Sequence, residues 1–416
     1  MGQFASHPIS DKELSHTSDQ RFSYAVGTMQ GYRLTQEDSH LSHFYQSIEF
    51  QTIDNTLITI DIKIFAVLDG HGGDESSKFL GENLSGYVMD EIIKRETVEN
   101  LQRFQTNEAL IIHKLQNSFI VADSHLYSHL HPHSHMQRSH GWKRNNSGST
   151  AIMAVIINNE DLYTVNSGDS RLILSYDGTA KSLSFDHKPN HIGELIRIND
   201  ADGSVSYNRV GGILALSRAF GDFNFKMREV VNHNYDFTTA GSRPESLCDG
   251  VVSQRPIVSL SSASTQVTCF PEVTLYKLSA HVEFIILACD GIYDVFSNQD
   301  LVGFIRKELA KGKDLEACIE TVMEECLDRS DEETGRGFDN MTMFLVACQL
   351  GKKAHSVMES SASSDALSQD LDKLSINSRL PVVSAARKEK EYEETEMYHE
   401  WAERIREKVK RELGLD

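Results

Sequence analysis

An apolar strand that stops abruptly at a carboxylate is the feature that most constrains how this sequence can fold. Residues 58–68 begin with isoleucines that alternate with polar side chains, which is typical of a half-buried strand, and the strand stops at Asp69. Asp290 directly follows a second apolar run, and Asp339 lies just before a third. Strand ends are rigid supports, and side chains from several of them can converge on one cleft. We therefore expect these three aspartates to lie together.

Carboxylates that converge in this way repel one another unless cations neutralise them. Oxygen-rich ligand sets suit Mg²⁺ or Mn²⁺, so the pattern predicts a divalent metal centre. Glycines follow Asp69 and let backbone and water approach closely. Taken one at a time, Asp-Gly pairs are more often simple turns. Their occurrence together with the motifs below favours the metal centre.

The rest of the pattern predicts an α+β fold, with antiparallel sheets and helices packed outside them. Short strands separated by tight turns predict an antiparallel meander over residues 150–157, 162–165 and 171–175. Helical patterns cover residues 75–130 and 298–328, and the two later apolar strands flank the second of these stretches.

Composition shifts divide the chain into four parts. We expect a mobile N-terminal segment at 1–20, a catalytic domain at 21–350 with a long polar insertion at 227–269, a Ser-rich linker at 351–384 and a charged helix at 385–416. One face of that helix carries an apolar stripe formed by Met397, Trp401, Ile405, Val409 and Leu413. Such a stripe requires cover, and docking on the catalytic domain is favoured over contact with a partner or a membrane.

Charge and cysteine usage exclude several classes of protein. The 61 acidic residues outnumber the 41 basic ones, and the net charge of −20 repels nucleic acid. No apolar run reaches the roughly 18 residues of a membrane span, and the N-terminus lacks the pattern of a secretory signal. The six cysteines form no C-x-x-C pair, which is typical of reduced thiols. A cytoplasmic protein, with or without a nuclear fraction, is expected.

Beyond these patterns, an ordered set of motifs resembles the type 2C metal-dependent serine/threonine protein phosphatases, and it is most similar to fungal members. The resemblance spans about residues 21–350. The motifs are Gly31-Tyr32-Arg33 with Glu37-Asp38, Asp69-Gly70-His71-Gly72-Gly73, Ser147-Gly148-Ser149-Thr150-Ala151, Asn166 to Arg171, Asp186-His187-Lys188-Pro189, Leu216-Ser217-Arg218, Ala288 to Asp294 and Phe338 to Thr342.

The resemblance implies two stacked antiparallel sheets flanked by helices, with the metals in a cleft at one end. Asp69 would bridge two ions of Mg²⁺ or Mn²⁺, and the Gly70 carbonyl would bind one of them. Asp290 and Asp339 would complete the protein ligands of the other. Two cations about 4 Å apart can clamp an in-line displacement and lower the pKa of a bridging water, whose hydroxide is the nucleophile.

The remaining roles implied by the resemblance surround this pair of metals. Glu37 and Asp38 would act through metal-bound water, and Asp169 and Asp294 resemble the ligands of a weaker third metal site.

Two further side chains would act on the substrate. Arg33 would hold the phosphate, because its guanidinium forks to two oxygens and stays charged. On its own, Arg33 could equally form a surface ion pair with Glu37 or Asp38. His71 would be the general acid, since an imidazolium can protonate the departing serine or threonine alkoxide.

Two other functions share these features. A metal-dependent hydrolase of small phosphorylated metabolites would use the same chemistry. A pseudophosphatase that only binds partners should have lost metal ligands, whereas this chain keeps Asp69, Asp290 and Asp339. The expected partners are therefore phosphorylated protein substrates, acted on by a monomeric enzyme.

The opening residues match the acceptor pattern for N-myristoylation at Gly2, with Ser6 at the required position. A single acyl chain gives marginal membrane binding, and neither a neighbouring cysteine nor a basic patch supplies a second signal. At most a reversible membrane contact is expected.

Overall fold

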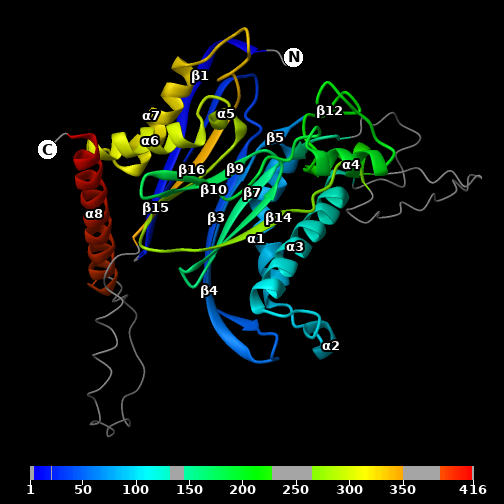
Figure 1. Ribbon diagram of the computed structural model, residues 1–416, viewed down its shortest axis with the longest axis horizontal. Coiled ribbons are helices and arrows are strands. Elements are labelled where there is room, and N and C mark those ends of the chain that lie inside the picture. The colour runs from blue at the N-terminus through cyan, green and yellow to red at the C-terminus, as the bar shows by residue number, and fades with distance from the viewer. Residues whose placement is uncertain (1–3, 20, 132–144, 227–264, 350–384, 415–416) are drawn as a thin grey trace, which may run out of the picture.

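The computed structural model describes residues 4–19, 21–131, 145–226, 265–349 and 385–414 (Figure 1). Side chains are described throughout these ranges except at residues 385–397 and 413. In this part of the chain, no helix combines the length and apolar character needed to cross a bilayer.

Two antiparallel sheets form the centre of the fold. The six-stranded sheet has the order β1 (Phe4–Ser18), β2 (Phe22–Arg33), β16 (Met341–Cys348), β15 (Val282–Ala288), β9 (Arg171–Tyr176) and β10 (Thr179–Ser182). The five-stranded sheet has the order β14 (Glu272–Lys277), β8 (Asp161–Ser167), β7 (Ala151–Ile157), β4 (Leu57–Leu68) and β3 (Ser39–Gln51).

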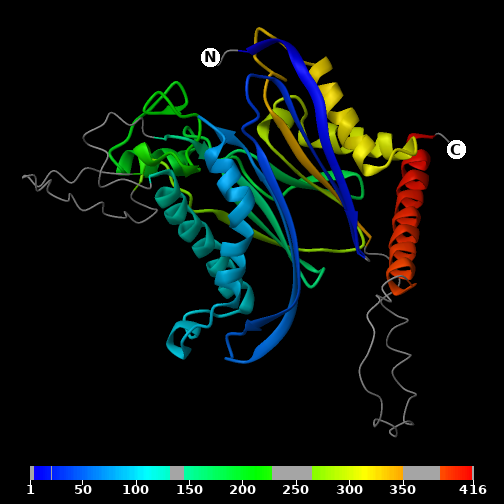
Figure 2. The ribbon, with the colours of Figure 1, turned by 180° about the vertical axis from the view of Figure 1, so that it is seen from behind.

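Helices cover the outer faces of both sheets, which gives an α-β-β-α order of layers and confirms the predicted fold class. Helices α1 (Glu75–Ile93) and α3 (Asn107–Leu130) pack on the five-stranded sheet. Helices α6 (Asn298–Ala310), α7 (Leu315–Asp328) and α8 (Ala385–Leu413) lie on the side of the six-stranded sheet, as Figure 2 shows from behind.

Shorter elements complete the chain. They are helices α2 (Val98–Leu101), α4 (Ile192–Asp200), α5 (Asp290–Tyr293) and η1 (Phe223–Phe225), the three-stranded sheet of β13 (Phe220–Gly221), β6 (Gly148–Ser149) and β5 (Gly70–His71), and the hairpin of β11 (Val205–Ser206) and β12 (Arg209–Val210).

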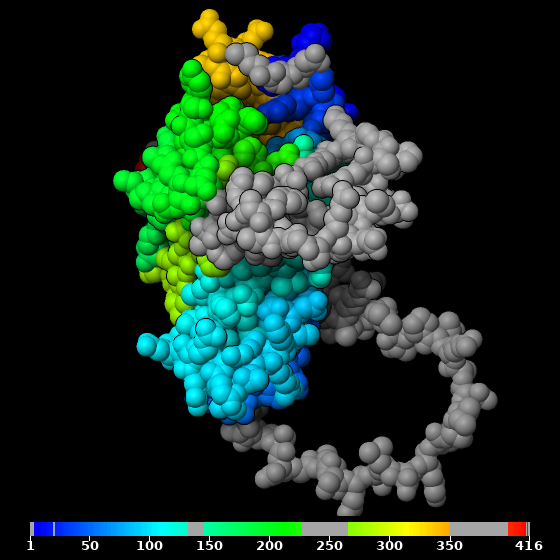
Figure 3. Space-filling model, turned by 90° about the vertical axis from the view of Figure 1, so that its right-hand side faces the viewer, coloured from blue at the N-terminus to red at the C-terminus, as the bar shows by residue number. Residues whose placement is uncertain are grey.

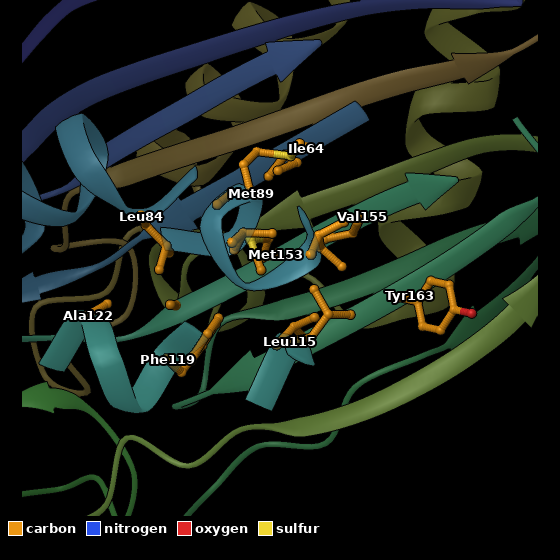
Figure 4. Close-up of a cluster of buried hydrophobic side chains, with 14 of the residues drawn as sticks. Ile64, Leu84, Met89, Leu115, Phe119, Ala122, Met153, Val155 and Tyr163 are labelled. Atoms are coloured by element: carbon orange, nitrogen blue, oxygen red, sulfur yellow. The ribbon is translucent and has the colours of Figure 1, made fainter. Parts of the chain in front are cut away.

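Strand β4 shows how alternation builds both layers of the core. Ile62 and Ile64 belong to the apolar cluster that β4 shares with α1 and α3, part of which Figure 4 shows. Phe65 and Val67 point the other way and belong to the cluster between the two sheets. The strand is therefore buried on both faces as it approaches Asp69, which fixes the position of that carboxylate.

The N-terminal segment is ordered as a strand, contrary to expectation. Residues 1–20 were expected to be mobile, but residues 4–18 form strand β1, which pairs with β2 along the edge of the six-stranded sheet. Its side chains are exposed or only partly buried, so the sequence carries no apolar run. Backbone hydrogen bonds to β2 define this strand, and hydrophobic patterning does not reveal them.

The expected meander is also wrong in part. Strands β7 and β8 form a hairpin in one sheet, whereas β9 and β10 form a hairpin in the other. The turn at 168–170 therefore carries the chain from one sheet to its neighbour. Tight turns predict where a chain reverses, but they do not specify which sheet receives the next strand. This crossing places Asp169 at one end of the sandwich, where strands of both sheets end.

The C-terminal helix is present, and its apolar stripe docks on the catalytic domain as favoured above. Trp401, Ile405 and Val409 are buried in the apolar cluster beneath α6 and α7. The side chains of Met397 and Leu413 lie outside the described residues, as do the linker at 351–384 and all but the last five residues of the insertion at 227–269.

Candidate metal centre

Aspartates from the strand ends of both sheets meet at one end of the sandwich. Asp69 follows β4, and Asp169 lies two residues beyond β8; these two strands belong to the five-stranded sheet. Asp290 follows β15 of the other sheet, after Cys289. One carboxylate oxygen from each of these three residues lies within 4.8 Å of the other two. The sheets therefore bring together two of the three aspartates singled out from strand ends, along with Asp169.

Asp339, the third of those aspartates, lines the same cleft but has a different partner. Its Oδ2 accepts a hydrogen bond of 2.6 Å from Arg33, which ends β2. The sequence left open an ion pair between Arg33 and Glu37 or Asp38. The structure pairs Arg33 with Asp339, so the guanidinium lies directly beside the carboxylate cluster.

The loop after β2 is held in place by Asn340. Its Oδ1 accepts a hydrogen bond of 2.9 Å from the Glu37 backbone, and its Nδ2 donates to the carbonyls of Gln30 and Thr35. Glu37 Oε2 accepts from the Gly73 backbone at 3.2 Å. These bonds fix the loop that carries Glu37 and its neighbour Asp38 against the cluster.

Gly70 packs against the loop that carries Glu37 and Asp38. A Cβ on Gly70 would collide with the Glu37 carbonyl oxygen, so only glycine fits there. Burial, together with the nearby charge of Asp339, raises the pKa of Asp38. A positive charge nearby would lower this pKa again and favour the charged carboxylate.

Burial and mutual repulsion also act on the clustered aspartates. Burial, followed by the charges of Asp290 and Asp38, raises the pKa of Asp69 well above its usual range. Burial, followed by Asp169 and Asp339, does the same to Asp290. Divalent cations relieve both effects, and carboxylate oxygens are the ligands that Mg²⁺ and Mn²⁺ prefer. The residues present therefore fit a divalent metal centre.

The side of the cluster around Asp169 carries a counter-ion. The Lys188 ammonium forms an ion pair with Asp169, whose side chain is buried. Asp294, at the end of α5, lies nearby: burial raises its pKa, while the charge of Lys188 opposes the rise. The two residues expected at a third metal site thus lie around one lysine.

His71 follows directly from the loop that carries Asp69 and Gly70. Its Nε2 lies 2.7 Å from Oδ2 of Asp222, which is buried. Burial lowers the pKa of His71, but the charge and hydrogen bond of Asp222 outweigh it, so the net shift is upward. The protonated form that a general acid requires is thereby favoured.

These groups open onto a cleft of about 610 Å³. Arg33, Asp69, His71 and Asp290 line one part of it. The segment that contains β12 lines another part, through Arg209, Leu214, Ala215 and Leu216. Figure 3 shows this end of the molecule, where the green segment lies beside the blue N-terminal strands and the orange residues before β16.

Sequence reasoning assigned no role to four residues of this site: Lys188, Arg209, Asp222 and Asn340. Lys188 and Asn340 belong to motifs of the family resemblance, so the sequence marked their positions but did not indicate what they do. The partner of Asp222 depends on the tertiary fold, because His71 and Asp222 are 151 residues apart. Arg209 bonds locally to the Ile213 carbonyl, and its position beside the cleft carried no signal in the sequence. Gly2 lies outside the described residues.

Comparisons with known proteins agree with this geometry. A family model described as "Protein phosphatase 2C" matches residues 22–335. The chain is 37% identical to protein phosphatase 2C homolog 4 of Saccharomyces cerevisiae, over 86% of this chain and 96% of that protein. It is 34% identical to protein phosphatase 2C homolog 2 of Schizosaccharomyces pombe, over 85% of this chain and 80% of that protein.

Solved structures share the fold at lower identity. A phosphatase from a pathogenic strain of Toxoplasma gondii superposes with a TM-score of 0.57 at 22% identity, over 83% of this chain and 98% of that one. Serine-threonine phosphatase 2C from Toxoplasma gondii gives 0.52 at 19% identity, over 81% and 99%. Together with the family match over most of its length, these findings show that the chain belongs to the protein phosphatase 2C family of metal-dependent serine/threonine protein phosphatases.

Proposed function

We propose that this protein hydrolyses phosphoserine and phosphothreonine in phosphorylated proteins by a two-metal, in-line displacement. The observation that carries the proposal is the meeting of Asp69, Asp169 and Asp290 within 4.8 Å, in the cleft that Arg33 and His71 also line. Phosphate-monoester hydrolysis is extremely slow without a catalyst, so a site for it must concentrate positive charge. Buried carboxylates provide that charge only by holding cations.

Two ions of Mg²⁺ or Mn²⁺ would be held mainly by Asp69. The Gly70 carbonyl would add a ligand for one ion, and Asp290 and Asp339 would add ligands for the other. When bound, the pair supplies charge neutralisation and lowers the pKa of a water between them.

Other carboxylates of the cluster have supporting roles in the proposal. Glu37 and Asp38 would orient water bound to the ions. Asp169 and Asp294 would hold a weaker third ion beside Lys188. The Lys188 charge already neutralises part of Asp169, which supports weak binding at that position.

Arg33 and His71 would act on the substrate. The Arg33 side chain is 43% exposed, so its guanidinium is accessible to a phosphate while one nitrogen stays bonded to Asp339. His71 would donate a proton to the oxygen that leaves with serine or threonine. An alkoxide is a poor leaving group, and this proton makes its departure feasible.

The experiment that tests the substrate class compares turnover of a phosphothreonine peptide, a sugar phosphate and an aryl phosphate by the purified full chain. Mg²⁺ or Mn²⁺ is supplied in one series, and excess chelator replaces it in the other. We expect metal-dependent turnover of the peptide, with kcat/KM well above that of the sugar phosphate. A preference for the sugar phosphate would favour a metabolite hydrolase. Peptide binding without turnover in either series would favour a pseudophosphatase.

We also propose that Gly2 is N-myristoylated and that the protein is a cytoplasmic monomer with a reversible membrane-bound fraction. The opening residues carry the acceptor pattern, with Ser6 at the required position. An intact mass measured on protein from a eukaryotic host should show the acyl increment, which Gly2→Ala should remove. An unmodified mass for the natural sequence would reject the modification, and retention on membranes at high salt would reject the single anchor.

A further inference from the structure

A buried carboxylate outside the proposed metal centre lies against His71. Oδ2 of Asp222 is 2.7 Å from Nε2 of His71, and the Asp222 side chain is 6% exposed. A carboxylate at this depth needs a fixed partner, because desolvation penalises an unpaired charge. The imidazole, whose side chain is 27% exposed, is that partner and also lines the cleft.

The backbone around this pair is arranged so that the two side chains can meet. In the three-stranded sheet, β6 lies between β5 and β13, and Gly148 pairs with His71 on one side and with Gly221 on the other. A Cβ on Gly148 would lie against both the His71 imidazole and the Asp222 carboxylate. The absence of a side chain at the central position leaves the gap through which they bond.

Asp222 is itself held firmly at the end of β13. Its φ of 48° lies in the left-handed region, which aspartate tolerates better than most residues. The preceding Gly221 donates its backbone N–H to Asp123 at 2.9 Å, and the Lys226 ammonium lies 2.8 Å from the same carboxylate. The turn that presents Asp222 is therefore anchored to α3 independently of His71.

We propose that Asp222 is a positioning residue for His71, and that its carboxylate holds the Nε2–H so that Nδ1 faces the leaving oxygen. This inference rests on the proposed function, in which His71 is the proton donor. As the P–O bond to serine or threonine breaks, the oxygen takes its electron pair and receives the proton from Nδ1. The imidazole then becomes neutral, keeps its Nε2–H on Asp222 and regains a proton from solvent.

The test compares leaving groups in a double-mutant cycle with Asp222→Ala, His71→Gln and the double variant. Each is assayed on a phosphothreonine peptide and on an aryl phosphate whose leaving group needs no proton. We expect Asp222→Ala to lower kcat on the peptide about 10- to 100-fold, with little change in KM. On the aryl phosphate the loss should stay below about threefold. In the His71→Gln background, removing Asp222 should change either rate less than about twofold.

Asp123→Asn is the matched control, because it loosens the same turn without touching His71. The Asp222 carboxylate stays in place in this control, so any preference for the aryl phosphate should be clearly smaller than that of Asp222→Ala; an equal preference would assign the effect to the loosened turn and overturn the positioning role. If Asp222→Ala does not fold, Asp222→Asn takes its place in the cycle. It keeps the size and one acceptor oxygen for the Nε2–H but loses the charge, so it should show a preference of the same sign and smaller size for the aryl phosphate.

The outcomes separate the pairing from the proposed function. Equal losses on both substrates for the Asp222 variant would overturn the positioning role while leaving His71 as the acid. The same holds if the double variant is slower than His71→Gln by as much as Asp222→Ala is slower than the natural chain. Equal losses for His71→Gln itself would overturn the acid role, and with it the role of Asp222. Retained metal-dependent turnover of the aryl phosphate in every variant would show that the metal centre is intact in all of them.

Discussion

Removing the indole of Trp401 should release α8 from the catalytic domain without stopping catalysis. The side chain is 2% exposed, stacks on Tyr398 with ring centroids 5.6 Å apart, and donates Nε1–H to the Glu283 carbonyl at 3.1 Å. Truncating a buried tryptophan to alanine costs about 3–5 kcal/mol. Trp401→Phe keeps a ring and loses the hydrogen bond, so it should cost about 1–3 kcal/mol.

The loss in Trp401→Ala has a ceiling, because α8 can undock while the rest of the domain stays folded. A chain that ends at residue 384 measures that ceiling. Urea unfolding should give the highest free energy of unfolding for the natural chain, a lower one for Trp401→Phe and a still lower one for Trp401→Ala. The loss in Trp401→Ala should be about 3–5 kcal/mol, or equal to the loss in the shortened chain if that is smaller. In Trp401→Ala, the backbone amides of α8 should exchange their hydrogens faster than those of the two sheets.

Two further results complete this prediction. Glu407 is exposed on the same helix, so Glu407→Ala should change stability by less than about 0.5 kcal/mol. Metal-dependent turnover of an aryl phosphate by Trp401→Ala and by the shortened chain should stay within about twofold of the natural chain, because none of the α8 side chains that the structure describes lines the cleft. The reasoning would be refuted if Trp401→Ala matched the natural chain in stability, or if a folded shortened chain lost its turnover.

Two predictions concern charged groups elsewhere. Arg33→Ala removes a charge-assisted contact with phosphate, so KM for a phosphopeptide should rise about tenfold or more, at least as clearly as kcat falls; an unchanged KM would argue against phosphate binding. Glu194 is buried, which opposes ionisation, but Arg218 and Arg197 lower its pKa from 4.5 to about 2. The stability that this pairing contributes is therefore present above about pH 4.5 and is lost as pH falls toward 2. The difference in urea midpoint between the natural chain and Glu194→Gln should shrink between pH 5 and pH 3, and an equal difference at both would contradict the assignment.

Local patterning was enough to predict antiparallel sheets with helices outside them, and the family resemblance added the stacking of two sheets. The alternating isoleucines of β4 predicted a strand, and Asp69 at its end predicted a rigid carboxylate, because period and strand ends are local properties. Strand β1 escaped detection because its polar side chains stay outside the core while its backbone is paired. The crossing between β8 and β9 escaped because turn chemistry does not specify the receiving sheet.

The residues of the site differ in how far the sequence alone could identify them. Strand ends alone pointed to Asp69, Asp290 and Asp339. Asp169 came only through the family resemblance, because it lies in a turn of ordinary appearance. The structure then added partners from distant parts of the chain, such as Asp222 for His71 and Asp339 for Arg33. Pairings across more than 100 residues depend on how strands are ordered in the sheets, which no local pattern specifies.

The central claim is that Asp69 holds the catalytic cations, and Asp69→Asn tests it most directly. The amide keeps the size of the carboxylate and removes its charge, so the fold should survive while bridging fails. Calorimetric titration with Mn²⁺ and phosphopeptide turnover should be measured on the same preparation. The account predicts a folded protein with markedly weaker Mn²⁺ binding and a kcat reduced by about 10²-fold or more. A folded Asp69→Asn protein that binds Mn²⁺ as tightly as the natural chain and turns over phosphopeptide at a similar rate would contradict it.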